Sequence, residues 1–241
     1  MDRYEAIEAA ADKQTDPAAQ KILLAALTDK YYGLRLKTLN TLDSATDNLK
    51  ETALPIILKL AKTDDNNLVK GAAIHAIGTS KIAAEQEPLF REGLKNQSYA
   101  VAGASLSAMA ELKPAEALPF ARSFEKDSEG SLTSAIVSVY AKSGADAEWP
   151  YVLNKLNEAD PQAKFDMLKD FIYMTAHVPS SAYAQQGINA LKDLGIKYKA
   201  EGFAPGLIRV LNQIKELRQK MNDSASADLI DEAIKQVNGA K

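Results

Sequence analysis

The sequence predicts an all-α protein, an α-solenoid in which helical hairpins repeat along the chain. Three observations lead to this fold class. The 241 residues are 46% hydrophobic but only 7% aromatic, which suits a core of closely packed helices. No stretch alternates apolar and polar residues in the way that a strand does. Finally, a pattern of polar and apolar residues recurs at the spacing of a helical hairpin.

Four segments carry this repeated pattern. They are DKYYGLRLKTLNTL from Asp29, DDNNLVKGAAIHAI from Asp64, NQSYAVAGASLSAM from Asn96 and DSEGSLTSAIVSVY from Asp127, with a weaker fifth copy from Asp160. Their starts lie 35, 32, 31 and 33 residues apart. Each segment has apolar residues five, ten and thirteen positions after its start, namely Leu34, Val69, Val101 and Leu132, then Leu39, Ile74, Leu106 and Val137, then Leu42, Ile77, Met109 and Tyr140. This spacing predicts a repeat of two helices.

Proline recurs with the same period in the intervening stretches. Pro55, Pro88, Pro119 and Pro150 lie 33, 31 and 31 residues apart. A proline lacks the N–H group and crowds the preceding turn, so it starts or kinks a helix. We therefore expect the prolines in the first, outer helix of each hairpin. The four segments then form the second helix, which packs between neighbouring repeats.

Caps and apolar spacing predict fourteen helices. The expected ranges are 3–12, 17–28, 31–43, 48–62, 67–78, 84–95, 98–112, 114–125, 130–142, 147–157, 161–176, 181–197, 204–222 and 226–237. The Asp or Asn that opens each segment is expected to cap the second helix through its side chain. Small residues in the second helices would let neighbouring helices approach closely; these are Ala72, Ala73, Ala76, Ala102, Gly103 and Ala104.

The pattern changes after residue 160. Pro205 precedes an apolar stripe at helical spacing, Leu207, Leu211, Ile214, Leu217 and Met221. The closing helix has its own stripe, Leu229, Ile230, Ala233, Ile234 and Val237, and would lie across the end as a cap. We expect a single domain over 1–241 with about five to seven two-helix repeats, regular over 1–160 and divergent over 161–241.

Charge and composition argue against several classes of protein. The 29 basic and 32 acidic residues give a formal net charge of −3 and no sustained basic field, so no nucleic-acid partner is expected. The N-terminus lacks the features of a signal peptide and no apolar run would span a bilayer, so we expect a soluble chain with no membrane partner. The absence of cysteine fits the cytoplasm and the periplasm equally, which leaves the compartment open.

The sequence contains no catalytic or metal-binding motif. His75 and His177 stand outside any metal-ligand spacing; the first is expected near the packed face of a helix and the second at a helix C-terminus. Ser105 lacks the strand, turn and glycine of a nucleophile elbow. The run from Asp64 to Asn67 lacks the glycine and later glutamate of a calcium loop. We expect no catalytic, cofactor-binding or metal-binding residue and no cofactor in this chain, so the chain alone is not expected to be an enzyme.

Recognition of another molecule would fall to exposed aromatic and arginine side chains, which dominate binding hot spots. The candidate interaction residues are Tyr31, Tyr32, Arg35 and Tyr99, and Trp149 and Tyr151 share their chemistry. Packing between repeats is the alternative for all of them. Tyr31 and Tyr99 stand at nearly equivalent positions of their repeats, and Arg35 aligns with Lys70.

The D-x-x-x-x-V/L-x-x-A-A-L/I pattern of the segments resembles HEAT and armadillo-like repeats. The run NQSYAVAGASLSAMAELKPAEALPFARSFEKD, followed by SLTSAIVSVYAKSGADAEWPYVLNKL, is similar to the C-terminal helical domain of bacterial zinc aminopeptidases of the aminopeptidase N family. The resemblance covers residues 1 to about 220. It implies a non-catalytic HEAT-like domain that covers the active-site cleft of a metallopeptidase and limits access to small peptides.

The same resemblance implies a longer parent polypeptide. Its zinc and catalytic glutamate would belong to a catalytic domain of that polypeptide, which would be the partner of this chain, with peptide substrate at the concave face. None of those catalytic residues maps here, because the sequence lacks both H-E-x-x-H and G-x-M-E-N. The alternative is a free-standing HEAT-repeat scaffold that binds a protein along its concave surface.

Overall fold

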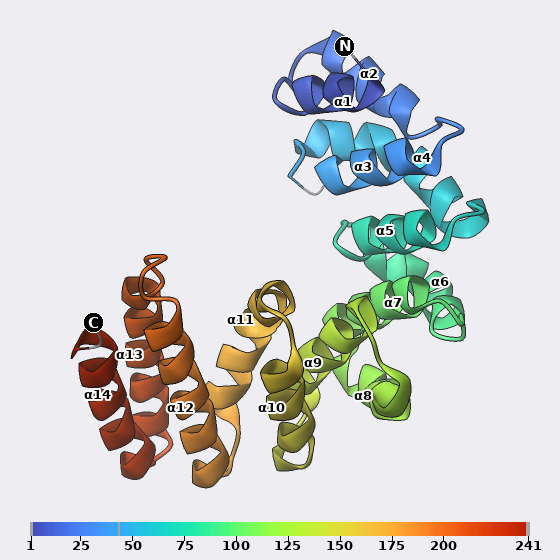
Figure 1. Cartoon of the computed structure of the whole chain (residues 1–241). Coiled ribbons are helices and arrows are strands. Elements are labelled where there is room, and N and C mark those ends of the chain that lie inside the picture. The colour runs from blue at the N-terminus through green and yellow to red at the C-terminus, as the bar shows by residue number, and fades with distance from the viewer. Residues whose placement is uncertain (1, 43, 240–241) are drawn as a thin grey trace. The chain divides into compact units, whose positions relative to one another are not determined.

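The computed structural model describes residues 2–42 and 44–239, with the side chain of Asp127 excepted. Within these ranges the structure contains fourteen α-helices, three short 3₁₀ helices and no β-strand (Figure 1). The all-α prediction is therefore confirmed. None of the helices in the described ranges has the length and apolar character that crossing a membrane requires.

The helices follow the expected ranges closely. They are α1 (Arg3–Ala11), α2 (Pro17–Ala26), α3 (Tyr32–Leu42), α4 (Asp47–Thr63), α5 (Asn67–Gly78), α6 (Glu87–Gly93), α7 (Tyr99–Leu112), α8 (Pro114–Phe124), α9 (Ser131–Ser143), α10 (Trp149–Glu158), α11 (Pro161–His177), α12 (Ser181–Lys197), α13 (Ala204–Lys220) and α14 (Ser224–Gly239). The 3₁₀ helices are η1 (Ala83–Gln86), η2 (Glu125–Asp127) and η3 (Asp146–Glu148). Residue 43, the expected end of the third helix, lies outside the described residues.

Two expected helices start with a 3₁₀ turn. The helices expected over 84–95 and 147–157 begin as η1 and η3 and become α-helical only at Glu87 and Trp149. Pro88 and Pro150, in the first turns of α6 and α10, explain this difference. A proline nitrogen has no hydrogen to donate to the carbonyl four residues earlier, so it weakens the α-helical hydrogen bonding of the turn before it and favours the first turn of a helix.

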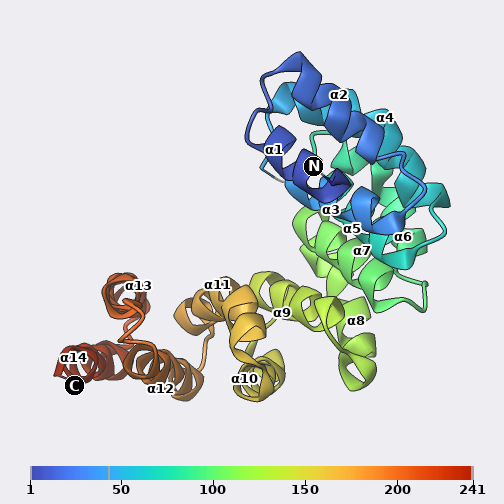
Figure 2. The same ribbon diagram turned by 45° about the horizontal axis from the view of Figure 1, so that its top comes forward.

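The helices form two compact units, residues 1–136 and 137–241, and α9 runs across the division. In the first unit α1, α3, α5 and α7 lie side by side in that order (Figure 1). Helix α4 packs against both α3 and α5, while α6 and α8 pack against α7. The view in Figure 2 shows α2 and α4 along one side of the row. We call α1, α3, α5 and α7 the inner row; the last three lie in segments expected to form the second helix of a hairpin.

The repeated apolar positions form the core between these helices. All twelve apolar residues five, ten and thirteen positions after the four segment starts are buried. Because those positions recur with the spacing of one face of a helix, burial of that face follows from the pattern. Pro55 and Pro119 lie inside the outer helices α4 and α8, as expected of the intervening stretches.

Small residues let the inner helices approach one another closely. A Cβ atom on Gly71 of α5 would lie 2.6 Å from the carbonyl oxygen of Ala100 in α7, and one on Gly78 would lie 2.8 Å from the Cβ of Ala108. A Cβ on Gly103 would lie 3.0 Å from the backbone of α9. The prediction of close approach is confirmed, with Ala73 and Ala102 buried and Ala72, Ala76 and Ala104 half-buried.

The capping prediction is wrong by two residues in three of the segments. The side chains of Asp29, Asp64 and Asn96 accept hydrogen bonds from the backbone N–H two residues on, at 2.8, 2.9 and 2.8 Å. Each therefore fixes the turn that precedes the helix. In α5 the cap is Asn66, whose side chain accepts from the N–H of Leu68 at 2.9 Å.

The remaining two copies of the segment differ in this respect. Asp160 is the N-cap of α11 and accepts a hydrogen bond from the N–H of Ala163 at 3.0 Å, as predicted. The side chain of Asp127 lies outside the described residues. The opening Asp or Asn thus marks the entry to each helix, but its place in the turn depends on the local backbone.

The core of the second unit contains Trp149. Its ring packs on Phe171 and Tyr183, with ring centroids 5.5 and 6.1 Å away, and its Nε1–H donates to Gln186 at 2.9 Å. The closing helix α14 packs against α12 and α13. Its stripe points inward, with Ile230, Ala233 and Val237 buried and Leu229 and Ile234 half-buried.

The predicted stripe of α13 is correct only as far as Ile214. Leu217 is half-buried, and Met221 is exposed because the helix ends at Lys220. Arg218 takes the buried position instead. Its guanidinium donates to Asp223 at 2.8 Å and to the carbonyl oxygen of Val178 at 2.6 Å. An arginine at this position joins the α13–α14 turn to the end of α11, which an apolar side chain could not do.

Candidate functional site

Exposed hydrophobic side chains of the first unit gather at the starts of its inner helices. Among its described residues this unit exposes six large hydrophobic side chains, Tyr4, Ile22, Tyr31, Tyr32, Leu68 and Tyr99, each with 39% to 51% of its surface accessible. All except Ile22 lie in, or directly before, the first turn of α1, α3, α5 or α7. We call Tyr4, Tyr31, Tyr32, Leu68 and Tyr99 the apolar edge.

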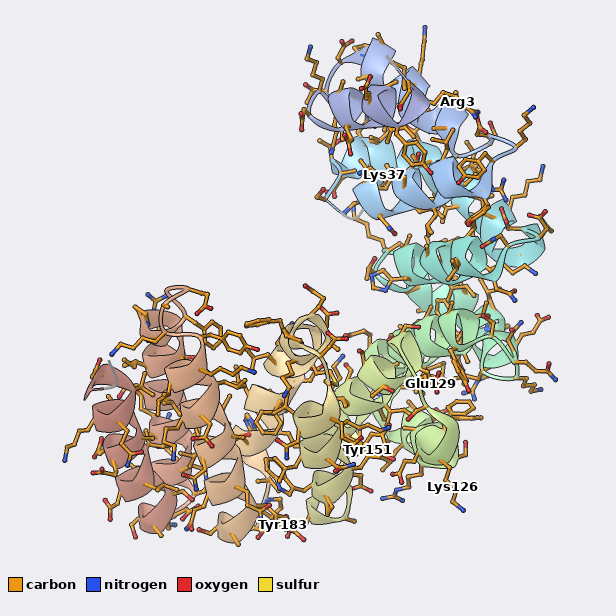
Figure 3. All side chains as sticks on the ribbon, in the orientation of Figure 1. Arg3, Lys37, Lys126, Glu129, Tyr151 and Tyr183 are labelled. Carbon is orange, nitrogen blue, oxygen red and sulfur yellow. The ribbon has the colours of Figure 1, made fainter. Side chains whose placement is uncertain are left out.

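Close contacts bring the four helix starts together. Arg3 beside Tyr4 forms an ion pair with Asp29 at 2.6 Å, and Arg35 in α3 pairs with Asp64 just before α5. The second turn of α5 meets the first turn of α7 where Gly71 approaches Ala100. Figure 3 shows the side chains, with Arg3 at α1, on the row of inner helices. The members of the apolar edge therefore follow one another across successive helices.

Three tyrosines form an aromatic cluster at one end of the apolar edge. The ring of Tyr31 lies edge-on to that of Tyr4, with centroids 6.5 Å apart, and 5.3 Å from that of Tyr32. A hydrogen bond with Tyr31 raises the pKa of Tyr4 above its ordinary value. Gly33 makes room for the cluster, since a Cβ there would lie 2.5 Å from the Tyr4 hydroxyl. Packed rings of this kind present a rigid surface.

Arg35, which the sequence also predicts as an interaction residue, is buried. Only 8% of its surface is accessible. Its guanidinium donates two hydrogen bonds of 2.8 Å to the carboxylate of Asp64, one to Asp65 at 3.1 Å and one to the carbonyl oxygen of Asp29 at 2.8 Å. This bidentate pair joins α3 to the turn before α5. Arg35 thus holds the helix starts together beneath the apolar edge.

The same contact sets the protonation of Asp64. Burial by itself raises the pKa of this carboxyl group, but hydrogen bonds from Arg35 and from the N–H of Asn66 outweigh it. The pKa of Asp64 is therefore below its ordinary value. The hydrogen bond to Asp64 likewise raises the pKa of Arg35. Both groups are charged throughout the neutral range, so the junction is a permanent ion pair.

Two pockets open beside the apolar edge. One, of about 340 Å³, is lined by Asp29, Lys30, Arg35 and Asp64 among others. The other, of about 320 Å³, lies one repeat further on and includes Lys70, Asn96 and Val101. Lys30 precedes Tyr31 directly, and Lys70 follows Leu68 by two residues. Residues of the apolar edge are thus sequence neighbours of residues that line the two pockets.

The remaining residues singled out from the sequence lie elsewhere. Trp149 is buried, and Tyr151 of α10, labelled in Figure 3, is half-buried with its ring edge-on to Tyr140 at 5.6 Å. His177 ends α11 as expected, and its ring stacks on Tyr173 at 4.1 Å. His75 does not lie near the packed face; it is exposed, because Ile74 and Ile77 occupy the buried face of α5.

Sequence reasoning missed two members of the apolar edge, Tyr4 and Leu68. Tyr4 follows Asp2 by two residues, as Tyr31 follows Asp29, with a basic residue between them in both cases. Leu68 follows Asp64 by four residues, close to the position of Tyr99 after Asn96. A comparison of the segment starts for any large hydrophobic residue, and not only for tyrosine, finds both.

The described residues include no group of three or more His, Asp and Glu side chains arranged to hold a metal ion. A comparison of the chain with protein-family models, with curated proteins and with solved structures finds no match.

Proposed function

We propose that this chain is a non-catalytic HEAT-like repeat domain that binds another polypeptide along the apolar edge. The observation that carries the proposal is the gathering of five exposed hydrophobic side chains at the starts of four neighbouring helices. Single exposed hydrophobic residues are normal on a soluble protein, whereas a contiguous group marks an interaction surface. Tyrosine suits this role because it buries a large area at a small cost in side-chain entropy.

The HEAT-like solenoid is part of this proposal. Its support is the 31 to 35-residue period, the order in which α1, α3, α5 and α7 contact one another, and the glycines between the inner helices. In such an array each hairpin buries its apolar face only against its neighbours. About five to seven repeats, ending in a modified cap over 161–241, would then display recognition residues at regular intervals.

Site-specific photocrosslinking tests binding at the apolar edge. A photoreactive amino acid replaces Leu68 or Tyr99 in the full chain, and the control carries it at Ile22, which is equally exposed but outside the edge. We expect both edge positions to capture the same protein and the Ile22 position not to. Capture of that protein at Ile22 as well, or of unrelated proteins at the two edge positions, would contradict the proposal.

The resemblance to aminopeptidases favours one particular partner. We propose that the partner is the catalytic domain of a zinc aminopeptidase in the same polypeptide, with the zinc held by that domain and none by this chain. The support is the similarity of the runs that start at Asn96 and Ser131 to the C-terminal helical domain of that family. The domain would then cover the active-site cleft and restrict entry to small peptides.

Peptidase assays on such a parent polypeptide test this second proposal. Removal of the helical domain is expected to change the preference between dipeptide and longer peptide substrates. A Leu68→Ser/Tyr99→Ser variant should change it in the same direction, and Ile22→Ser should leave it unchanged. If the length preference is the same with and without the domain, its role as a cover is wrong. A reading frame without any zinc-binding domain would favour the free-standing scaffold.

A further inference from the structure

The two pockets beside the apolar edge occupy equivalent positions in successive repeats. Arg35 stands six residues after the segment start Asp29, and Lys70 stands six residues after the next segment start, Asp64. Asp64 in the first pocket corresponds in the same way to Asn96 in the second. The second pocket therefore keeps the cation of the first but has an amide where the first has a carboxylate.

This exchange removes from the second pocket the carboxylate that binds the cation of the first. Arg35 meets the Asp64 carboxylate through two bonds of 2.8 Å. In the part of the chain that the structure describes, no carboxylate lies within ion-pair distance of Lys70 or of Lys62, which lines the same pocket. The amide oxygen of Asn96 accepts from the N–H of Ser98 at 2.8 Å and carries no charge.

The composition of the pocket favours an anion. Lys62, Lys70 and Glu92 are the charged residues among those that line this space of about 320 Å³, so the lining has a net positive charge. Ile74 and Val101, both buried, form part of its apolar lining. The pocket also adjoins the apolar edge, because Asn96 belongs to its lining and accepts a hydrogen bond from the N–H of Ser98, the residue before Tyr99.

We propose that this pocket binds the side-chain carboxylate of an Asp or Glu residue of the polypeptide that lies on the apolar edge. The incoming carboxylate takes the place that Asp64 has in the preceding repeat, with Lys70 as its partner and Lys62 beside it. This inference rests on the proposed function and adds the chemistry of the partner: an acidic residue flanked by hydrophobic residues that contact Leu68 and Tyr99.

A pair of small probes tests the pocket without any partner. N-acetyl-glutamate amide and N-acetyl-glutamine amide differ only in the carboxylate, and the Hε and Cε resonances of lysine report on each ammonium group. We expect the glutamate probe to shift the resonances of Lys70 and Lys62 in a saturable way, and the glutamine probe not to shift them. Lys59, which lines the pocket that already contains Asp64, is the control. Equal shifts from both probes, or shifts at Lys59 alone, would overturn the inference.

Asn96→Asp provides a sharper test because it supplies the carboxylate from within the chain. The variant keeps the turn, since Asp64 accepts the equivalent N–H bond in the preceding repeat. We expect Asn96→Asp and Lys70→Gln each to abolish the response of this pocket to the glutamate probe, while circular dichroism shows unchanged helix content. A response that survives both substitutions would overturn the inference.

Binding of the crosslinked partner separates this inference from the proposed function. We expect Lys70→Gln and Asn96→Asp to weaken partner binding by about tenfold or more, as loss of a charge-assisted contact does, and Lys59→Gln to change it by less than about twofold. If Leu68→Ser abolishes binding and Lys70→Gln has no effect, the apolar edge stands and the carboxylate pocket is wrong. If neither has an effect, both are wrong.

Discussion

At the scale of single residues, the buried polar groups decide where the helices meet. Arg35 and Arg218 are both inside their units, and each binds a carboxylate and a backbone carbonyl group. The distant partner in sequence is the carboxylate of Asp64 for Arg35 and the carbonyl of Val178 for Arg218. Removal of one partner from such a pair leaves a buried charge without compensation, which costs far more than the pair contributes. Ser105 is the opposite case, a buried hydroxyl group without a hydrogen-bond partner among the described residues.

Asp64→Asn is expected to lower the free energy of unfolding at pH 7 by about 3 kcal/mol, because it removes the buried, bidentate carboxylate of Arg35 and leaves only the exposed one of Asp65. The matched control is Asp65→Asn, whose side chain is 93% exposed and should cost less than about 0.5 kcal/mol. Urea denaturation measures both. Equal effects at the two positions would contradict the role of the pair.

The stabilisation by Asp64 depends on pH. Its folded-state pKa lies below the ordinary value, so the contribution is fully present above the pKa of the unfolded state, about 3.9. It is lost as the pH falls through the lower, folded-state pKa. We therefore expect the difference in unfolding free energy between the native chain and Asp64→Asn to be constant from about pH 6 to 8 and to shrink below about pH 4. A difference that grows on acidification would show that another group is responsible.

Ser105→Ala is expected to leave stability unchanged or to raise it by up to about 1 kcal/mol, because it removes a buried donor that has no acceptor within the described part of the chain. Ser134→Ala in α9 is a control for the loss of a serine from a helix of the same unit. Thermal denaturation followed by circular dichroism gives both values. A clear loss of stability in Ser105→Ala would show that the hydroxyl is hydrogen-bonded in solution.

At the scale of the helices, close approach depends on particular glycines. Gly71 faces the backbone of α7, whereas a Cβ atom on Gly206 in the first turn of α13 would point into open space, with no neighbouring atom of the described residues within 4 Å. Backbone cannot move aside as the end of a flexible side chain can. The distance between two helices thus depends on whether a glycine lies at their contact. The number of glycines in a helix does not by itself determine that distance.

Gly71→Ala should therefore destabilise the chain by about 1–3 kcal/mol, since its methyl group would lie 2.6 Å from a carbonyl oxygen. Gly206→Ala should raise stability by about 0.5 kcal/mol, because alanine is the better helix former and meets open space. Parallel urea denaturation of the two variants tests the pair. If both substitutions stabilise the chain, α5 and α7 are not in backbone contact.

At the scale of the whole molecule, the chain consists of two units that each have their own core. The first contains the apolar edge and the inner row of helices, and the second contains the Trp149 cluster and the Arg218 network. In the repeat array that we propose, stability is the sum of local terms and nearest-neighbour contacts. A unit that keeps its neighbouring helices should therefore keep its structure.

A fragment of residues 1–143, which ends with the complete α9, is expected to fold by itself. Its helix content per residue by circular dichroism should be close to that of the full chain, and it should unfold cooperatively. A fragment of residues 1–93, which lacks α7, is the contrasting case, because it removes the helix that covers α5. If the fragment 1–143 is unfolded, or if the fragment 1–93 is equally stable, the contacts between α5 and α7 are not what stabilises the first unit.

The sequence by itself determined the all-α class, the approximate range of every helix and the buried faces of the inner helices. These are local or periodic properties, since propensity, proline positions and apolar spacing act within one or two turns of a helix. It also pointed to Tyr31, Tyr32 and Tyr99 as members of an exposed surface, but not to Tyr4 and Leu68.

Only the tertiary structure decided which polar residues face a neighbour. Arg35 meets Asp64 across 29 residues and Arg218 meets Val178 across 40 residues. The period places Asp64 at the start of the segment that follows Arg35, but it does not show that the two side chains form a pair. The apolar edge likewise exists because the starts of α1, α3, α5 and α7 lie together in space. Helix formation depends on neighbours along the chain, whereas pairing of charges and formation of a surface depend on neighbours across it.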